Sequence, residues 1–246
     1  MTTSPLPAVA WIAGVGASAG LDAALARRFA AGGLVVAVTG RHAVRLQALA
    51  AEIVDAGGQA HALPGDVSSE HDVERLSRAL ESLGTLRSAV FNAGNAVRGT
   101  PLELTPAEFE STWRGSTYAG FLFARAALPR LLAAGGGSLL FTGATASLRG
   151  RGPFVAFAAA KAGLRSVAQS LAREYGPRGV HVAHVVIDGG IDGEQLRRNA
   201  PELAADAGAD RLLSPAAIAE TYWQLHEQHR SAWTHELDLR PYRETF

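Results

Sequence analysis

The 246-residue chain contains no cysteine, and this absence excludes several kinds of chemistry. Without thiols there is no disulfide framework, no thiolate nucleophile and no zinc–thiolate site. The start of the chain, "MTTSPLPAVAW", also lacks the basic segment and the apolar stretch of a signal peptide. Both absences fit a reducing compartment, and we expect a cytoplasmic protein.

Neither sign of charge is in excess, and long apolar runs are absent as well. The chain has 23 basic and 23 acidic side chains, so its formal net charge is zero and nothing indicates nucleic acid or a polyanionic partner. No apolar run reaches the roughly 20 residues that cross a bilayer, so we expect no membrane partner. These exclusions leave a small molecule as the expected substrate.

The sequence does contain a regular alternation of short apolar runs and amphipathic stretches. The runs that predict buried strands are residues 8–15, 34–38, 59–63, 86–91, 138–142, 180–187 and 234–239. The stretches that predict helices include residues 21–31, 43–55 and 70–83, and two more helices are expected to begin at Thr105 and Ser214, each followed by proline. The alternation predicts one α/β domain over residues 1–246, with a parallel sheet covered on both faces.

Residues 189–212 are the least regular part of the chain. They follow an expected strand, are polar and contain four glycines. This pattern suits a flap over a site, and a plain surface excursion fits it equally well.

The stretch "VGASAGLDAALARRFA" follows the first expected strand and opens the first helix. Gly16 and Gly20 permit a tight turn and close approach of a ligand to the backbone. The helix N-terminus then offers unpaired N–H groups to a pyrophosphate. An ordinary strand-to-helix turn is the alternative interpretation of this segment.

Three further signals strengthen the nucleotide interpretation. The second strand ends in "AVTGRH", where Arg41 cannot accept a hydrogen bond from a ribose but can pair with a 2′-phosphate. This favours NADP over NAD, although a solvated surface arginine remains the alternative. Asp66 in "GDVSS" and Asn92 in "FNAG" follow the third and fourth strands, at the edge where open α/β sheets bind ligands.

Together these motifs resemble the short-chain dehydrogenase/reductase family over nearly the whole chain. The resemblance implies a Rossmann-type, doubly wound sheet of seven strands. It also implies a homodimer or homotetramer that is joined through the long helices. The cofactor positions that it implies are Gly16, Ser18, Gly20, Leu21, Arg41, Asp66, Val67, Asn92, Ala93, Gly94, Lys161, Gly189 and Ile191.

The resemblance also implies a mechanism whose reagents are mostly missing here. In the family a tyrosine transfers the proton, a lysine four residues later holds the nicotinamide ribose, a serine steadies the carbonyl oxygen, and an asparagine holds a relay water. The tyrosine position is Phe157, the serine position is Ala144, and the asparagine position is Ser116. Lys161 alone is kept, and a phenylalanine cannot act as an acid or base.

Departures also occur around the expected cofactor. The last glycine of the turn is Asp22, whose carboxylate would repel a pyrophosphate. Either Asp22 points to solvent and cofactor affinity falls somewhat, or the nucleotide site is impaired. Beyond the sixth strand the family's proline is Asp188 and its threonine is Gly193.

Several side chains are candidates to replace the missing reagents. Lys161 with a lowered pKa and Ser116 are the candidate catalytic residues, and Asp188 is a possible acid. We expect Thr145 and Ser147 to bond only loop backbone. Among the histidines, we expect His181 and His184 on opposite faces of one strand, and His226 and His229 on one helix with only water as partner. No metal site is expected.

Two functions from different classes are open. The first is an NADP(H)-dependent oxidoreductase that acts on a small carbonyl, alcohol or imine compound with non-standard proton delivery. The second is a catalytically inactive binding, regulatory or partner protein with an impaired cofactor site, since fold does not fix function. A non-redox enzyme such as a dehydratase has no specific support in the sequence.

Overall fold

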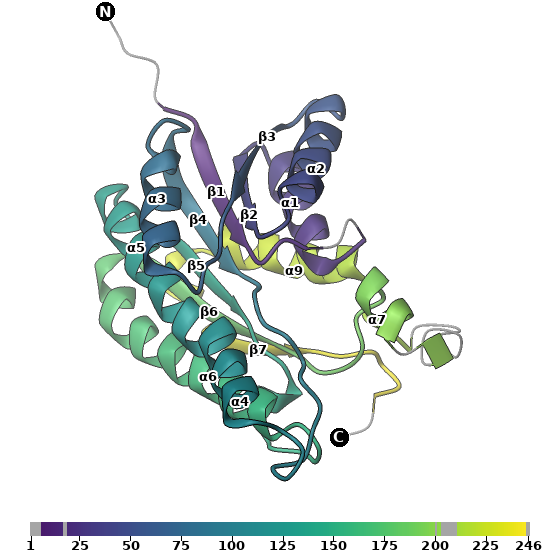
Figure 1. The fold of residues 1–246 in the computed structure, drawn as a ribbon. Helices are drawn as coiled ribbons and strands as arrows, with labels where there is room; N and C mark the ends of the chain where they lie inside the picture. The colour runs from purple at the N-terminus through teal and green to yellow at the C-terminus, as the bar shows by residue number, and fades with distance from the viewer. Residues whose placement is uncertain (1–5, 17–18, 200, 203–210, 245–246) are drawn as a thin grey trace, which may run out of the picture.

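One parallel sheet of seven strands forms the centre of the molecule (Figure 1). The computed structural model describes residues 6–16, 19–199, 201–202 and 211–244. The strand order is β3-β2-β1-β4-β5-β6-β7. The strands are β1 Ala8–Ala13, β2 Val35–Gly40, β3 Gln59–Pro64, β4 Thr85–Phe91, β5 Gly137–Thr142, β6 Val180–Ile187 and β7 Glu236–Leu239. The predicted fold class is therefore confirmed.

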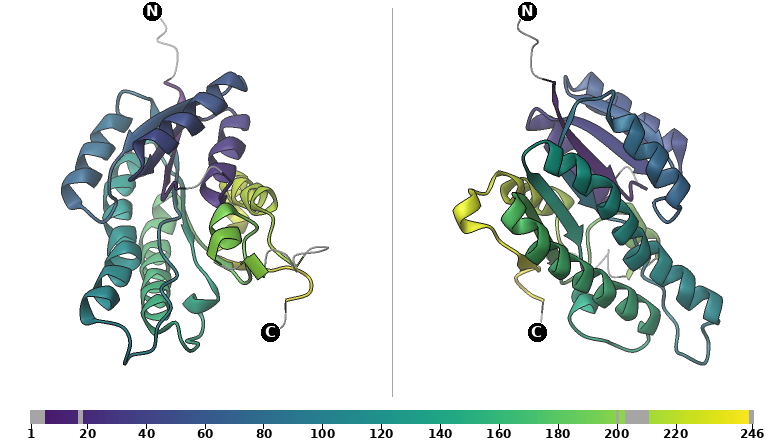
Figure 2. Two further views of the ribbon diagram at one scale, coloured as in Figure 1. Left: turned by 45° about the vertical axis from the view of Figure 1, so that its right-hand side comes forward. Right: turned by 90° about the vertical axis from the view of Figure 1, so that its left-hand side faces the viewer.

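Helices cover both faces of this sheet, and each face has its own apolar core (Figure 2). On one face lie α1 Leu21–Ala31, α2 Ala43–Asp55 and α9 Pro215–Glu227. On the other lie α3 Glu70–Leu80, α5 Ala119–Ala133 and α6 Val155–Tyr175. The central strands are mostly apolar on both sides, which suits a sheet that is covered on both faces.

The predicted helix starts at Thr105 and Ser214 are confirmed. The Thr105 hydroxyl accepts from the Glu108 backbone N–H, and the Glu108 carboxylate accepts from the Thr105 backbone, which completes a capping box. The Ser214 hydroxyl accepts from the Ala217 backbone N–H. The first strand is shorter than predicted because the N–H groups of residues 14 and 15 already turn to bond the carbonyl of Thr39.

The long helical run that precedes β5 contains a π-helical turn. α4 Pro106–Trp113 passes through a π turn at Arg114–Tyr118 and continues as α5. Such single turns widen a helix locally and are frequent at functional sites. Ser116 lies in this turn and is 1% exposed, so the turn places a hydroxyl inside the molecule.

The chain reverses its winding direction between β1 and β4. β1 pairs with β2 on one side and with β4 on the other. At the carboxyl ends of this pair, Gly14 has φ +98°, and a Cβ there would lie 2.6 Å from the backbone nitrogen of Ala93. Ligands of open α/β sheets bind in the crevice at this switch point, which locates the candidate site.

Candidate functional site

The glycine turn after β1 forms one end of the candidate site. Gly20 is the N-cap of α1, and Gly40 at the end of β2 lies so close that a Cβ on it would be 2.1 Å from the carbonyl oxygen of Val15. The absence of a side chain at Gly40 therefore lets the turn after β1 pack directly against the end of β2. The predicted contact at Ser18 lies outside the described residues.

Asp22 occupies the inside of this turn. It lies in the first turn of α1, is 7% exposed, and its carboxylate accepts a hydrogen bond from the backbone N–H of Gly16. The interpretation that Asp22 points to solvent is therefore wrong. The chain's own carboxylate takes an N–H group at the place where a phosphate would bind, and it benefits from the helix N-terminus in the same way.

Two arginines flank the turn. Arg41 is exposed after β2, at the position where a 2′-phosphate is expected. Arg45, one helical turn further, donates to the carbonyl of Gly16 (3.2 Å) and lies 4.0 Å from the carboxylate of Glu194. Arg45 was not predicted as part of the site: it lies in the first turn of α2, whereas Arg41 precedes that helix, so helical spacing does not relate the two.

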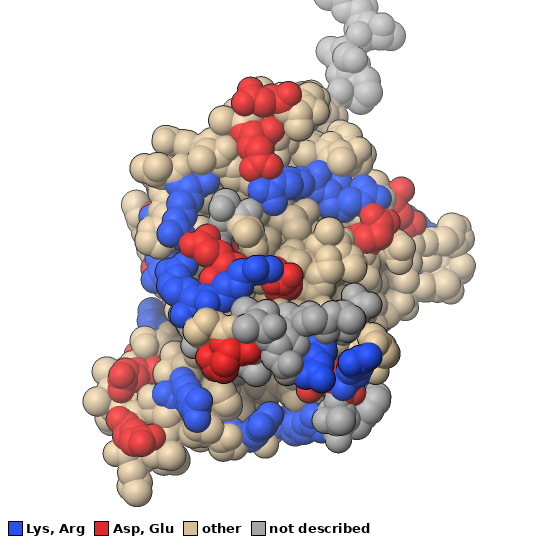
Figure 3. Space-filling model, turned by 90° about the vertical axis from the view of Figure 1, so that its right-hand side faces the viewer, with Lys and Arg blue, Asp and Glu red and all other residues tan. Residues whose placement is uncertain are grey.

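Charges of both signs are interspersed on the face of the molecule that Figure 3 presents, as far as the described residues extend. The arginines near the glycine turn are therefore local groups within a mixed surface. Such an arrangement suits recognition of one small anionic group.

The loop after β3 is held by its own side chains. One carboxylate oxygen of Asp66 accepts from the backbone N–H (2.8 Å) and the hydroxyl (2.7 Å) of Ser68. The backbone N–H of Asp66 in turn donates to Asp72 (2.9 Å), and Val67 is buried. Asp66 thus lies where an adenine-side acid is expected, at the carboxyl edge of the sheet.

Lys161, Ser116 and Gly94 meet at the centre of the site. Lys161 is the only lysine of the chain, and its buried ammonium donates to the carbonyl of Thr142 across 2.7 Å. Burial lowers the pKa of this ammonium to about 8. Gly94 has φ +143°, and a Cβ there would lie 3.3 Å from the Lys161 Nζ and 3.7 Å from the Ser116 Oγ.

The Ser116 hydroxyl is buried and has no hydrogen-bond partner among the described residues. An unsatisfied buried hydroxyl costs free energy, of the order of 1–3 kcal/mol. The group is therefore placed to bind something that enters beside Lys161, such as a water molecule or a ligand oxygen.

Two positions of the site, Phe157 and Ala144, lack the hydroxyl that the family has there. Phe157 lies one helical turn before Lys161 on α6, and the Lys161 Nζ is 5.9 Å from the centre of its ring. Ala144 follows β5, and its backbone N–H donates to the hydroxyl of Ser147 (3.0 Å). Ser147 therefore bonds loop backbone, as predicted.

Asp188 is buried at the carboxyl end of β6 and accepts a hydrogen bond from the hydroxyl of Thr145. The expectation that Thr145 bonds only backbone is therefore wrong. Arg240 lies 3.4 Å from the other carboxylate oxygen of Asp188. Asp188 thus ties the turn after β5 to the end of the chain after β7.

The segment after β6 folds back over the glycine turn. Gly189 has φ +148°, and a Cβ on Gly193 would lie 2.9 Å from the carbonyl oxygen of Ala19. Ile191 forms an isolated bridge with Leu213, which fixes the start of the segment. α7 Glu194–Asn199 follows, and residues 200 and 203–210 of the predicted flap lie outside the described residues.

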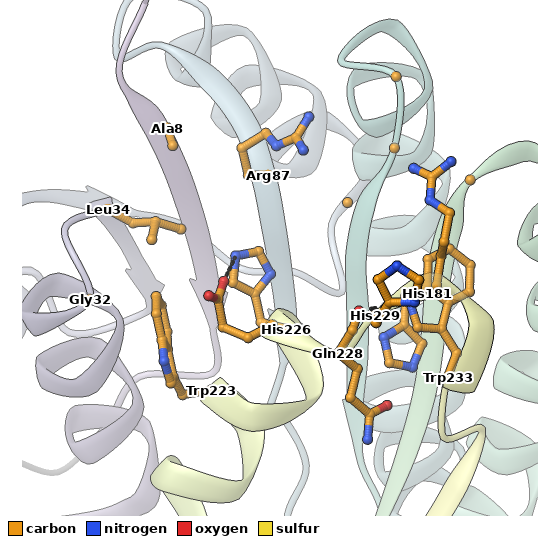
Figure 4. Close-up of a pocket in the computed structure, with 16 residues that line it drawn as sticks. Ala8, Gly32, Leu34, Arg87, His181, Trp223, His226, Gln228, His229 and Trp233 are labelled. Atoms are coloured by element: carbon orange, nitrogen blue, oxygen red, sulfur yellow. Dashed lines mark hydrogen bonds and ion pairs between the residues drawn. The ribbon is translucent and has the colours of Figure 1, made fainter.

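A pocket of about 560 Å³ lies at the opposite, amino-terminal edge of the sheet (Figure 4). Its walls include Trp223, which packs edge-on against Phe29, and Trp233, which stacks on His181. Because these rings already have packing partners, and Lys161 is not among the lining residues, we place the candidate site at the switch point.

The histidines have partners that the sequence did not reveal. His226 bonds the hydroxyl of Ser138 and His229 that of Ser231 (2.8 Å each), so the expectation of water alone is wrong for both. His229 also lies beyond the end of α9, so the two do not share a helix. His181 and His184 lie on opposite faces of β6, as predicted.

The described part of the chain shows neither a cluster of metal ligands nor a membrane-spanning helix. No three histidine or acidic side chains there stand close enough together to hold a metal ion. None of the described helices is both long and apolar enough to span a bilayer.

Comparison with known proteins gives one family. The model of the short chain dehydrogenase family matches residues 10–203. The oxidoreductase asL5 of Sarocladium schorii is 32% identical over 169 residues, which are 68% of this chain and 66% of that protein. The chain thus spans about two thirds of the length of this curated relative.

Solved structures agree with this result. A short-chain dehydrogenase from Rhodopseudomonas palustris has a TM-score of 0.82 at 39% identity, over 96% of this chain and 99% of that one. A metagenomic short-chain oxidoreductase in complex with NADP has a TM-score of 0.80 at 26% identity, over 97% and 99%. The chain that places Lys161 beside the switch point of this sheet belongs to the short-chain dehydrogenase family.

Proposed function

We propose that this protein is an NADP(H)-dependent oxidoreductase with non-standard proton delivery. The observation that carries the proposal is Lys161. Of the 23 lysine and arginine residues, 22 are arginines, and the one lysine is buried beside the switch point. An arginine cannot lose its proton and presents a wide planar group, whereas a lysine is a compact donor whose pKa shifts on burial.

The residues around the crevice fit a dinucleotide at two of its three parts. Lys161 and Asn92 border the place of a nicotinamide ribose, and Arg41 suits the 2′-phosphate of NADP. NADPH, when bound, supplies the hydride. At the third part, the pyrophosphate, Asp22 opposes the cofactor, because its carboxylate holds the Gly16 N–H.

The proton chemistry differs from that of the family because two hydroxyls are absent. Removing one positioned donor costs about 10²–10³ in rate, and losing the proton donor costs roughly 10²–10⁴ more. Two proton carriers border Gly94, the Lys161 ammonium and the Ser116 hydroxyl. We propose that these two groups hold a water molecule that replaces the missing acid.

An imine is the substrate class that best suits such a site. An imine nitrogen is basic enough to carry a proton before hydride arrives, so it needs less help from positioned hydroxyls than a carbonyl oxygen does. The absence of donors at Ala144 and Phe157 therefore weighs less against imine reduction than against ketone reduction.

We also propose a homodimer that is joined through the α4–α5 run. Large apolar side chains remain exposed on this run: Phe109 (41%), Trp113 (38%) and Phe121 (48%). Apolar groups that gather on one helix of a folded chain mark a protein interface more often than a bare surface. A tetramer would need a second interface of this kind.

The second candidate is an inactive binding or regulatory protein, and Asp22 is the observation that favours it. Binding of NADPH and NADH by isothermal titration calorimetry separates the two proposals. The first expects saturable NADPH binding at micromolar to millimolar concentration that Lys161→Met weakens about tenfold or more. Absence of binding by either cofactor at millimolar concentration would leave the second.

A further inference from the structure

His184 is a buried base that the proposed function does not use. It lies on β6 beneath α6 and is 0% exposed. Its Nδ1 contacts the carboxylate of Glu236 on β7 (2.9 Å), which in turn accepts two hydrogen bonds of 2.7 Å from Arg165 on α6. Three elements of the fold are thus tied together through one imidazole.

The hydrogen bond to Glu236 fixes the tautomer of this imidazole. A carboxylate only accepts hydrogen bonds, so Nδ1 carries the proton and Nε2 presents its lone pair. Burial lowers the pKa of His184 to about 4, and the neighbouring cations Lys161 and Arg165 act in the same direction. The ring is therefore neutral at pH 7, with one acceptor that has no partner among the described residues.

This acceptor points at the turn that follows β5. A Cβ on Gly143 would lie 2.2 Å from the His184 Nε2 and 2.9 Å from the Ser147 Oγ, so both atoms face the same point. The Ser147 oxygen already accepts from the Ala144 N–H, which leaves its own proton to donate. The Ser147 hydroxyl and the Nε2 acceptor of His184, which has no donor among the described residues, thus lie on the same side of Gly143.

We propose that His184 is a positioning residue that holds the turn of residues 143–147 from beneath. The chain Arg165–Glu236–His184 presents Nε2 as an acceptor for the Ser147 hydroxyl, and Gly143 provides the space for the ring. The turn carries Ala144 and Thr145, which border the candidate site. Any effect of His184 on catalysis rests on the proposed function, whereas the packing of its ring against the turn does not.

A pair of conservative variants tests the role of each ring nitrogen. His184→Asn keeps a donor near the place of Nδ1 and removes Nε2, whereas His184→Gln keeps a polar atom near the place of Nε2. In ¹H–¹⁵N spectra we expect His184→Asn and Ser147→Ala to shift the amide signals of Ala144 and Thr145, and His184→Gln to return them toward the native positions. Equal shifts in His184→Asn and His184→Gln would overturn the proposal.

The imidazole can be observed directly as well. ¹⁵N spectra of the native protein should show a proton on Nδ1, a lone pair on Nε2 and no titration between pH 6 and 9. A proton on Nε2 would contradict the assigned tautomer.

Steric rescue provides a second, independent test. Gly143→Ala places a methyl group against the ring and should lower the melting temperature by roughly 5–10 °C. Removal of a buried imidazole is costly in itself, so the rescue is read as a difference: Gly143→Ala should lower the melting temperature less in a His184→Ala background than in the native protein, because the ring that the methyl group meets is gone. Gly150→Ala is the matched control, since a Cβ there meets nothing within 4 Å.

Failure of this proposal is distinguishable from failure of the proposed function. If Gly143→Ala is tolerated as well as Gly150→Ala, or if His184→Ala does not rescue it, the positioning role is wrong whatever the cofactor. If NADPH does not bind but the spectra and the rescue behave as expected, the proposed function is wrong and the positioning role stands.

Discussion

The ammonium of Lys161 lies 5.9 Å from the centre of the Phe157 ring, one turn earlier on the same helix. A ring in this place has no proton to exchange, and the ammonium donates to the carbonyl of Thr142. The buried cation therefore has one backbone partner and one aromatic neighbour. The proton chemistry of the site therefore depends on Lys161 and on the residue at position 157.

Titration of Lys161 gives the first prediction. Burial lowers its pKa from the ordinary 10.5 to about 8, so between these values the unfolded chain binds a proton that the folded chain does not. The free energy of unfolding should therefore rise with pH between about 8 and 10.5, by at most about 3 kcal/mol from this group.

Because Lys161 is the only lysine, NMR of the ¹³C-dimethylated protein reports on this single side chain. The pH-dependent rise in the free energy of unfolding should be smaller in Lys161→Met, measured by urea denaturation at each pH. Parallel curves for the two proteins would contradict the lowered pKa.

Removal of the carboxylate at Asp22 should strengthen cofactor binding. Asp22→Gly releases the Gly16 N–H and takes away a charge that repels a pyrophosphate, so we expect NADPH affinity to rise about tenfold. Asp22→Asn separates charge from shape, and should give an intermediate gain. Calorimetry that finds unchanged or weaker binding in both variants would show that Asp22 does not compete with the cofactor.

Restoration of the two hydroxyls should create ketone reduction if NADPH binds. In Ala144→Ser/Phe157→Tyr the new phenol lies near the Lys161 ammonium, which lowers its pKa. We expect the rate of NADPH oxidation with small ketones to rise at least about 100-fold over the native protein. Lys161→Met added to this double variant is the control and should abolish most of the gain.

Arg41 should set the preference between the two nicotinamide cofactors. Arg41→Ala removes the group that pairs with a 2′-phosphate, so NADPH affinity should fall by about ten- to a hundredfold while NADH affinity changes less than about twofold. Arg78→Ala on α3, exposed on the other face of the sheet, is the matched control. An equal loss for both cofactors would point to a general effect on the fold.

The exposed apolar run on α4 and α5 should be an interface between two copies of the chain. Phe121→Glu places a charge on this run and should convert the dimer to a monomer, as measured by size-exclusion chromatography with light scattering. Leu102→Ser changes a side chain that is 98% exposed in the preceding loop and should leave the dimer intact. A native protein that is monomeric at micromolar concentration would remove the proposal.

Local signals were enough to predict the order of elements. The capping box at Thr105 and the serine–proline start at Ser214 identify helix starts because they act within one turn of the chain. Strand β6 was predicted with its observed bounds because both its faces are buried and its residues are uniformly apolar apart from two histidines. That Lys161 and the glycine turn serve one cofactor site stays a prediction, which rests on the resemblance and not on a local signal.

What only the tertiary structure decided is where polar side chains far apart in sequence meet. The sequence left the direction of Asp22 open, because the fold of the turn around Gly16 determines whether a carboxylate can reach an N–H. The partner of Thr145 is 43 residues away, and the Gly143–His184 contact depends on the register of β5 with β6. Helices and caps arise from interactions between near neighbours, whereas buried hydrogen bonds arise when the sheet brings distant strands together, and no local pattern records that meeting.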